Sequence, residues 1–201
     1  AEASAATFSD GWLRTGDAGY LDEGDQLVVL GRVSEVVRTA AGERFIPNFI
    51  ENRIKFSPYV RNVAVFGAGR DRLTALVCID YEAVGHWAER RAITYGSYSE
   101  LSQKPEVLTL IEGVLAHVNT LQPPPLRVRR FANLHKDFDP DDGEITRTRK
   151  LRRSVIEQTY APLIDALYSD VKTVGFEAAI VYEDGTHGVL KRDLTIREVP
   201  A

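Results

Sequence analysis

Residues 59–79 read YVRNVAVFGAGRDRLTALVCI and contain two apolar runs separated by a short polar loop. Both runs, 59–66 and 73–79, are rich in the β-branched and aromatic residues that strands favour. The loop between them, 67–72, holds two glycines and three charged residues. This pattern predicts two antiparallel strands joined by a turn, from which the rest of the fold can be worked outward.

Further strands are predicted on both sides of this pair. Residues 20–30 carry two apolar runs around an acidic, glycine-containing turn, which is the signal of a β-hairpin. Residues 126–134 read as a single strand. At the end of the chain, residues 176–182 and 189–199 alternate around a turn at 183–186, which predicts a last hairpin.

Helices fill the intervals between these strands. Apolar spacing and proline positions predict helices over residues 47–56, 82–93, 105–121 and about 152–168. The last of them is expected to be interrupted near Pro162. Ser97 and Glu100 have the spacing of a capping box, in which each side chain accepts a free backbone N–H. The predicted fold class is therefore α+β, with short antiparallel sheets and helices packed against one side of them.

The composition excludes several classes of protein. The 201 residues include 25 Lys and Arg against 29 Asp and Glu, a formal net charge of −4. Nucleic-acid binding rests largely on a basic surface, so this balance argues against a nucleic acid as the partner. No run approaches the roughly 18 apolar residues of a membrane-spanning helix, which leaves at most a peripheral contact with a membrane.

Cysteine, histidine and methionine usage bears on the cellular compartment, on metal binding and on the length of the parent chain. Cys78, the single cysteine, lies in an apolar run and is expected to be a buried structural thiol. It cannot form an intramolecular disulfide, and a reducing compartment, the cytoplasm, fits this usage best. The four histidines are scattered without metal-ligand spacing, so no metal site is predicted. Because the sequence contains no methionine, even at position 1, we expect a piece of a longer chain.

One constellation of residues could bind a diol. Asp17 follows Arg14-Thr15-Gly16, and Arg32 comes fifteen residues later at the far end of the hairpin. A carboxylate can accept both hydroxyls of a vicinal diol such as ribose, and a nearby guanidinium could lie across the same ligand. An ordinary turn and a solvated arginine would give the same pattern.

Two further segments are candidates for function. The connection at 34–42 has few bulky anchors, which suits either a hinge or an ordinary loop. The run at 147–153 contains five cations among seven residues. Guanidinium and ammonium groups suit a polyphosphate ligand, and a solvated helix start is the alternative. Cations at a helix start oppose the macrodipole by about 0.3–1 kcal/mol each, which favours a functional reason for this run.

These motifs, taken in order, resemble the C-terminal part of the adenylate-forming enzymes, which include acyl-CoA synthetases, luciferases and peptide-synthetase adenylation domains. The matching motifs are GWLRTGD at 11–17, Gly31-Arg32, the loop at Gly42 and GEITRTRKLRR at 143–153. The resemblance covers about residues 9–168.

Within this superfamily the sequence looks most like the long-chain fatty acyl-CoA synthetases. Ile50-Glu51-Asn52 and Ser57-Pro58 stand before the strand that ends at Phe66, and a helical insert follows at about 82–121. The resemblance implies the fold and the chemistry of that family.

The resemblance implies roles for five residues. Asp17 would bind both ribose hydroxyls of ATP or of the acyl-adenylate, and Arg32 would assist at the same nucleotide. Ser34 falls at the hinge position, and Gly42 lies in the loop that turns toward the CoA pantetheine. Lys150 matches the catalytic lysine of adenylation. ATP, Mg²⁺ and CoA would be substrates of the full-length enzyme, and none is expected to bind tightly to this piece.

Three positions depart from the family pattern. Ser34 stands where the family usually has Asp or Lys, although the acidic residue common just after the hinge is present as Glu35. Phe49 stands where the family often has Glu, and Arg147 replaces the usual proline before the lysine. None of these changes removes Asp17 or Lys150.

The resemblance also implies a division of the chain. Residues 1–33 would be the final hairpin of a large N-terminal adenylation domain together with the hinge, and residues 34–170 would be the C-terminal lid domain. Residues 171–201 form a β-hairpin extension outside the resemblance. The partner would be the large domain of the same polypeptide, which holds the ATP loop and the acyl tunnel. We therefore expect no synthetase activity from this piece alone.

The sequence thus predicts the C-terminal domain of a long-chain fatty acid–CoA ligase that forms acyl-AMP and then acyl-CoA. One alternative is a ligase for another carboxylic acid, whether aryl, bile or medium-chain. A second is an acyl-AMP ligase that loads a carrier protein. A third is a non-catalytic interaction module that keeps the fold without the chemistry.

Overall fold

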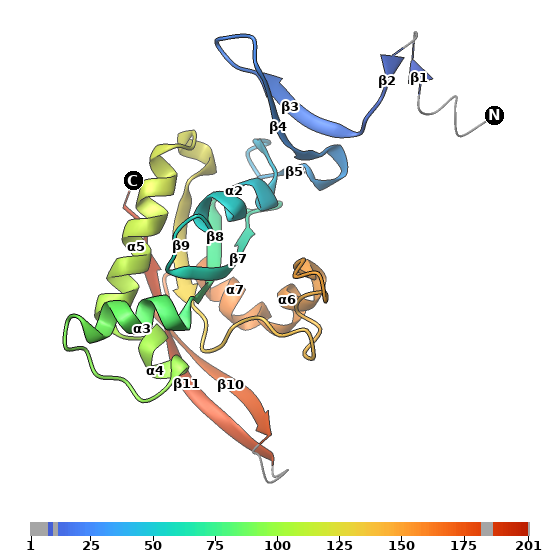
Figure 1. Ribbon diagram of the computed structural model, residues 1–201. Helices are drawn as coiled ribbons and strands as arrows, with labels where there is room; N and C mark the ends of the chain where they lie inside the picture. The colour runs from blue at the N-terminus through green and yellow to red at the C-terminus, as the bar shows by residue number, and fades with distance from the viewer. Residues whose placement is uncertain (1–7, 10–11, 182–186, 201) are drawn as a thin grey trace.

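The computed structural model describes residues 8–9, 12–181 and 187–200 and has a five-stranded sheet at its centre (Figure 1). The strand order is β10-β11-β9-β8-β7. The strands are β7 (Val60–Phe66), β8 (Leu73–Ile79), β9 (Val128–Asn133), β10 (Thr173–Val181) and β11 (His187–Glu198). Two-stranded ladders precede the sheet: β1 (Phe8–Ser9) with β2 (Trp12–Leu13), β3 (Asp17–Leu21) with β4 (Leu27–Arg32), and β5 (Val37–Arg38) with β6 (Arg44–Phe45).

The predicted antiparallel pair, β7 and β8, is confirmed, with Val63 opposite Val77. The strand expected at 126–134 is β9, but it runs parallel to β8, so the all-antiparallel arrangement expected from the sequence is wrong. A parallel neighbour requires a long crossover connection, which the helical segment between the two strands supplies. This segment contains α3 (Tyr81–Glu89), α4 (Tyr98–Ser102) and α5 (Pro105–Thr120).

Helices cover both faces of the sheet, whereas we expected them on one (Figure 1). On one face, α2 (Pro47–Ile54), α3 and α5 pack through residues such as Ile50 and Ile111. On the other face, α6 (Arg153–Thr159) and α7 (Ala161–Leu167) pack through Ile156 and Leu163. The physical reason lies in β8, whose seven residues are all buried, because a strand without polar alternation needs cover on both sides.

Helix boundaries largely follow the predicted signals. Ser97 Oγ accepts the N–H of Glu100 (3.2 Å), as a capping box requires, but the Glu100 carboxylate accepts the N–H of Gly96 (2.9 Å) rather than that of Ser97. The helix expected after the basic run divides at Tyr160 into α6 and α7, because Pro162 lacks the N–H that would continue one helix. The helices expected over 47–56, 82–93 and 105–121 are confirmed as α2, α3 and α5. Each helix in the part of the chain that the structure describes is too short or too polar to span a bilayer.

The C-terminal hairpin joins the central sheet. β10 and β11 pair from Thr173 opposite Thr195 onward, and the turn expected at 183–186 lies outside the described residues. β11 also pairs antiparallel with β9, with Ile196 opposite Ala132. The hairpin therefore extends the central sheet by two strands.

A buried arginine anchors the approach to this hairpin. Arg130 on β9 is 5% exposed, and its Nη1 donates to the carbonyl oxygens of Ala166, Leu167 and Ser169. Its Nη2 donates to the carbonyl oxygen of Val171 (2.6 Å). The last turn of a helix leaves carbonyls without intrahelical partners, and Arg130 supplies donors to those of α7. We call Arg130 and these four carbonyls the Arg130 clamp.

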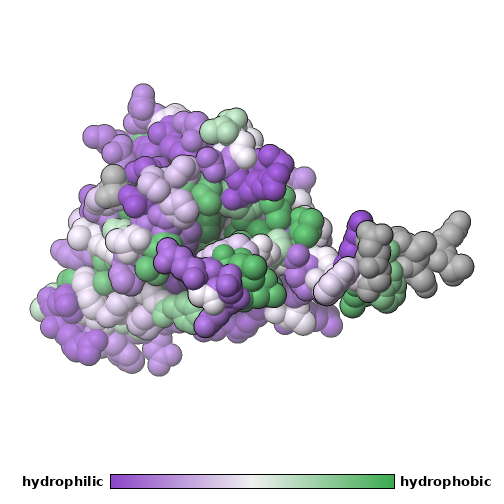
Figure 2. All heavy atoms as spheres, turned by 90° about the horizontal axis from the view of Figure 1, so that it is seen from above, coloured by the Kyte–Doolittle hydropathy of each residue, from purple (hydrophilic) through white to green (hydrophobic). Residues whose placement is uncertain are grey.

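The β3–β4 hairpin, expected from residues 20–30, is confirmed and stands apart from the central sheet (Figure 1). Several of its apolar side chains face solvent: Leu21 is 63% exposed, Leu27 68% and Val29 56%. In Figure 2, seen from above relative to Figure 1, hydrophobic residues are visible on the surface of the molecule. Contiguous exposed apolar surface of this kind marks a site of interaction with another domain or protein.

Candidate functional site

The structure brings the predicted nucleotide residues together. Asp17 and Arg32 are directly opposite each other on β3 and β4, and Arg32 Nη1 lies 3.0 Å from Asp17 Oδ1. Arg32 Nη1 also donates to the carbonyl oxygen of Thr15 (2.9 Å). The Asp17 side chain is 42% exposed and the Arg32 side chain 61%, so the ion pair is weakly held and open to a ligand from solvent.

The predicted hinge position lies in a short exposed turn. Ser34 is the middle residue of a 3₁₀ turn, Val33–Glu35, which contains no buried residue. Just before it, Gly31 has φ +152°, and a Cβ there would lie 3.1 Å from Glu35 Oε2 and 3.3 Å from Ile46 Cγ2. A turn with no buried side chain offers little resistance to a change of backbone dihedrals.

Gly42 lies in the loop of the β5–β6 hairpin. It has φ +89°, which favours glycine, and a Cβ there would meet no atom within 4 Å. The buried Thr39 closes the loop, since its Oγ1 accepts the N–H of Glu43 (3.2 Å) and its carbonyl accepts that of Gly42 (2.9 Å). The hairpin is tied to the β7–β8 loop by the bond from the Ala40 N–H to the Arg70 carbonyl oxygen (2.8 Å). Gly42 is thus an open, exposed position on an anchored loop.

Lys150 stands on a tight hairpin formed by residues 145–151, which we call the lysine hairpin. Ile145 pairs with Leu151 at its base. The Thr146 N–H donates to the Lys150 carbonyl (2.8 Å), and Thr146 Oγ1 accepts the Lys150 N–H (3.0 Å). The Lys150 side chain is exposed, and its ammonium group has no partner within the described residues. The backbone at Lys150 is fixed while its charge remains available to a ligand.

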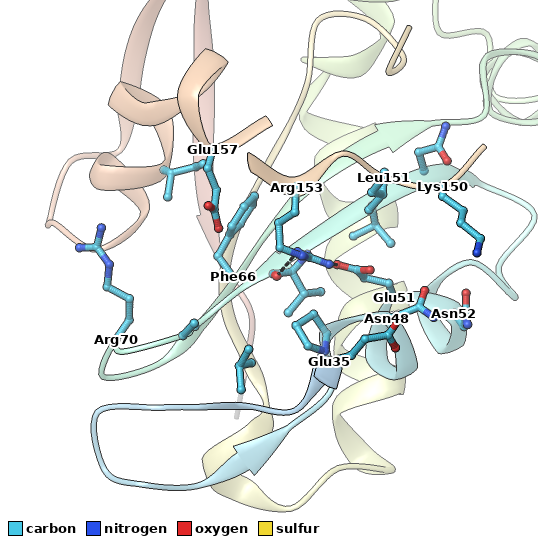
Figure 3. A pocket seen from close by; sticks show the side chains of 18 of the residues that line it. Glu35, Asn48, Glu51, Asn52, Phe66, Arg70, Lys150, Leu151, Arg153 and Glu157 are labelled. Atoms are coloured by element: carbon cyan, nitrogen blue, oxygen red, sulfur yellow. Dashed lines mark hydrogen bonds and ion pairs between the residues drawn. The ribbon is translucent and has the colours of Figure 1, made fainter. Parts of the chain in front are cut away.

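Lys150 and the predicted hinge residue, Ser34, line the same cavity. A groove of about 960 Å³ runs between α2 and β7 on one side and the lysine hairpin, α6 and α7 on the other. Both Ser34 and Lys150 line it, and Phe66 contributes to its apolar wall. Figure 3 shows the Lys150 side chain extending on the side where Asn48 and Asn52 of α2 lie. We call this cavity the hinge groove.

An ion pair between a buried carboxylate and a half-buried guanidinium lines the groove. The Glu51 side chain is 3% exposed, and its Oε1 accepts Arg153 Nη2 (2.7 Å) and the N–H of Val65 (2.8 Å). Arg153 Nη1 donates to the carbonyl oxygen of Val65 (2.8 Å; Figure 3). Burial raises the pKa of the Glu51 carboxyl, and the Arg153 charge opposes this rise. β7 is an edge strand, so the pair satisfies backbone groups that no neighbouring strand can reach.

The sequence analysis did not identify this pair. Glu51 was quoted only as part of the Ile50-Glu51-Asn52 motif, and Arg153 only as part of the basic run. Arg153 turns inward, whereas Arg147 and Lys150 of the same run are exposed. A signal was present: Glu51 lies three residues before Ile54, on the buried face of a helix, where a charged residue needs a partner.

A second buried carboxylate lies at the other end of the lysine hairpin. The Glu144 side chain is 1% exposed; its Oε1 accepts the Tyr160 hydroxyl (2.7 Å) and its Oε2 accepts Lys136 Nζ (2.8 Å) and the N–H of Asp139 (2.9 Å). The Glu144 carbonyl accepts the N–H of Arg152 (2.8 Å). Burial and the neighbouring carboxylate both raise the pKa of Tyr160. Spacing did not reveal this network either.

The single cysteine lies away from solvent. Cys78 is fully buried, as expected, and burial raises the pKa of its thiol. Within the described residues, no group of three His, Cys, Asp or Glu side chains is placed to hold a metal ion.

These features define an α+β domain that presents Lys150 in a groove also lined by the turn that links it to a separate N-terminal hairpin. The chain belongs to the AMP-binding enzyme C-terminal domain family, whose sequence model matches residues 34–172. The fold class expected from the sequence and the resemblance to the adenylate-forming enzymes are thereby confirmed.

The curated relatives are fatty-acid–CoA ligases. The long-chain-fatty-acid–CoA ligase FadD15 of Mycobacterium tuberculosis is 32% identical over 169 residues, which is 84% of this chain and 28% of FadD15. The long-chain-fatty-acid–CoA ligase ACSBG1 of Homo sapiens is 30% identical over 185 residues, covering 83% of this chain and 26% of ACSBG1. This chain therefore spans a little over a quarter of the length of these two relatives.

A solved structure shares the fold. The adenylation domain of the carboxylate reductase from Mycobacterium chelonae superposes with a TM-score of 0.59 at 28% identity. The match covers 84% of this chain and 25% of that domain.

Proposed function

We propose that this chain is the C-terminal lid domain of a long-chain fatty acid–CoA ligase and that Lys150 acts in formation of the acyl-adenylate. The observation that carries the proposal is the exposed ammonium group of Lys150, unpaired within the described residues, at the rim of the hinge groove. The names of FadD15 and ACSBG1 supply the substrate class.

In the first half-reaction a carboxylate oxygen of the fatty acid attacks the α-phosphorus of ATP, and the bond to pyrophosphate breaks. Both reactants are anions, so a fixed positive charge between them lowers the barrier electrostatically. A lysine suits this role because its compact charge on a long stem can reach out from one domain to a ligand held by another.

The nucleotide and CoA would meet other residues of this chain. Asp17 would accept the ribose hydroxyls, and sharing its carboxylate with Arg32 costs little because the pair is exposed. In the second half-reaction the CoA thiol attacks the acyl carbonyl and AMP leaves, which requires Lys150 to withdraw. The withdrawal would be a rotation of the domain, and the exposed turn at Ser34 would absorb the change in backbone dihedrals. The Gly42 loop would then approach the pantetheine.

The exposed apolar side chains of the β3–β4 hairpin support a large N-terminal domain of the same polypeptide as the partner. Mg²⁺ would accompany the ATP phosphates. The isolated chain should show no turnover. A cytoplasmic location stays a prediction.

The likeness to a carboxylate reductase adenylation domain favours a second candidate. In that case the polypeptide would activate a carboxylic acid as its adenylate and pass the acyl group to an acceptor other than CoA. Lys150 would keep the same role, because the first half-reaction is shared.

The test uses the full-length polypeptide that contains this chain. Lys150→Ala should lower acyl-AMP formation from hexadecanoate and ATP by at least about 10²-fold, measured by pyrophosphate exchange, because charge stabilisation is lost. Thioester formation from supplied hexadecanoyl-AMP and CoA should be spared. Arg147→Ala, an exposed cation of the same hairpin, is the matched control and should leave both steps unchanged. Normal adenylation by Lys150→Ala would reject the proposed role.

A further inference from the structure

The lysine hairpin is attached to the domain core at both of its ends. Glu144 immediately precedes it, and Arg153 follows two residues after its last member. Each end is bound through a carboxylate whose side chain is at most 3% exposed. Ile145 and Leu151 at the base of the hairpin pack against the core, whereas residues 147–150 between them are all exposed.

The C-terminal attachment leads toward the hinge. Arg153 is bound by Glu51 of α2, and α2 begins two residues after β6. The three hydrogen bonds among Glu51, Arg153 and the peptide groups of Val65 are between 2.7 and 2.8 Å long and form a closed ring. A guanidinium held by two acceptors in a ring has one orientation, which fixes the start of α6 and thus the end of the hairpin.

The N-terminal attachment binds the hairpin to the core on the α6 and α7 side of the sheet. Tyr160 at the end of α6 donates to Glu144 Oε1, while Lys136 and the Asp139 N–H donate to Oε2. Both carboxylate oxygens of Glu144 are therefore engaged, which removes the rotational freedom of the side chain. The Arg152 N–H donates to the Glu144 carbonyl and closes the base of the hairpin.

We propose that Glu51 and Glu144 are positioning residues for Lys150, which hold the lysine hairpin in one place relative to α2 and the hinge groove. The inference rests on the proposed role of Lys150 in adenylation. A charge that is delivered to a ligand held elsewhere must arrive at a defined point, since a misplacement of about 1 Å can cost about 10²-fold in rate. The exposed tip of the hairpin, residues 147–150, has no packing of its own to provide that precision.

A purely structural role for the same carboxylates predicts a different outcome. Loss of a structural group lowers the stability of the whole domain and affects both half-reactions alike. Loss of a positioning group lowers the rate of the step that uses Lys150 and spares the other. The two half-reactions of one enzyme therefore provide an internal comparison.

The catalytic test uses the full-length polypeptide with Glu51→Gln, Arg153→Lys and Tyr160→Phe. Glu51→Gln should lower the kcat of acyl-AMP formation by about 10²-fold and leave thioester formation from supplied acyl-AMP within about twofold. Arg153→Lys keeps the charge opposite Glu51 but loses the fork that also reaches Val65. Its rate of acyl-AMP formation should therefore lie between those of Glu51→Gln and the wild-type protein. Tyr160→Phe removes only a hydroxyl and keeps the buried ring, so it tests the Glu144 end with little change in packing.

The matched control is Asn119→Ala on α5. Asn119 is 3% exposed, donates to the Val128 carbonyl (2.8 Å) and accepts the Val128 N–H (2.9 Å). It binds a strand peptide much as Glu51 binds Val65, but it has no connection to the lysine hairpin. Asn119→Ala should lower the melting temperature without changing the ratio of the two half-reaction rates.

Limited digestion with trypsin measures anchoring without any catalysis. Arg147, Arg149 and Lys150 are exposed cleavage sites in the hairpin, while Arg90 and Arg91 between α3 and α4 serve as reference sites. In Glu51→Gln and Tyr160→Phe, cleavage in the hairpin should accelerate about tenfold relative to the reference sites, because the local opening free energy falls. In Asn119→Ala that ratio should not change.

The outcomes separate this inference from the function on which it rests. Equal loss of both half-reactions in Glu51→Gln, unchanged adenylation, or unchanged hairpin cleavage would each overturn the positioning role. If Lys150→Ala adenylates normally, the proposed function falls, whatever the anchor variants do. If Lys150→Ala is inactive in adenylation while Glu51→Gln and Tyr160→Phe are not, only the positioning role falls.

Discussion

The Arg130 clamp predicts that one substitution in β9 should loosen both α7 and the C-terminal hairpin. In Arg130→Met the side chain keeps an unbranched apolar stem, but the carbonyl oxygens of Ala166, Leu167, Ser169 and Val171 all lose a donor. Because Arg130 is 5% exposed, water cannot readily replace those donors. The carbonyl groups are left unsatisfied, which is the costly outcome for a buried polar group.

The magnitude follows from the bond lengths. The bonds to Ala166 and Leu167 are 3.2 and 3.3 Å long and share one nitrogen, whereas the bond to Val171 is 2.6 Å. We count the clamp as two full charge-assisted bonds, which contribute about 3–6 kcal/mol. Removing a buried charge relieves part of its desolvation cost, so the net loss should be about 3 kcal/mol. For a chain of this size, that corresponds to a melting temperature lower by about 6–12 °C.

Thermal unfolding followed by calorimetry measures this loss, with Arg129→Met as the control. Arg129 neighbours Arg130 on the same strand but is only half-buried, and its one bond, to the Pro124 carbonyl, is 3.4 Å long. Arg129→Met should therefore change stability by no more than about 0.5 kcal/mol. Equal melting temperatures for the two variants would refute the clamp. Amide exchange at Ile196, which donates to the Lys172 carbonyl, should accelerate only in Arg130→Met.

Three further perturbations give distinct results. Burial lowers the pKa of His135 to about 4 from 6.5, so protonation favours the unfolded chain. The free energy of unfolding should therefore fall by about 3 kcal/mol between pH 6.5 and 4. In urea titrations, His135→Gln should remove this fall in unfolding free energy, and an unchanged pH dependence would contradict the assignment to His135. Gly42→Ala at φ +89° should cost about 1 kcal/mol of backbone strain and slow thioester formation in the full-length polypeptide while sparing adenylation; equal slowing of both steps argues against the loop's role. Asp17→Asn should raise the KM for ATP by about tenfold without changing the melting temperature, since the pair is exposed, and an unaltered KM would remove Asp17 from the nucleotide site.

Local patterns were sufficient for most of the secondary structure. The apolar runs around the Gly67–Arg72 loop became β7 and β8. Pro47 and Pro105, each at the start of a helical pattern, predicted α2 and α5. These signals work because turn chemistry, missing N–H groups and side-chain periodicity act over a few residues. The capping box at Ser97 was right in the hydroxyl contact and displaced by one residue in the carboxylate contact, because an exposed glutamate can reach either N–H.

Long-range arrangement was less predictable. The direction of β9 depends on the path of the helical crossover, and the second helical layer follows from the cover that β8 requires on both faces. The apolar run of β8 contained a usable signal, since strands covered on one face alternate and this one does not.

The sequence by itself determined the chemistry that the domain can offer: a lysine in a basic run, an aspartate paired with an arginine across a hairpin, and glycines where the backbone must turn. Only the tertiary structure decided which of those charges remain available. Glu51 and Arg153 are 102 residues apart and meet beside the edge strand β7, so the charge of Arg153 is paired while Lys150 stays exposed. Spacing along the chain cannot reveal such a pair, because burial makes a charge find its partner through the packing of whole elements rather than through neighbouring residues.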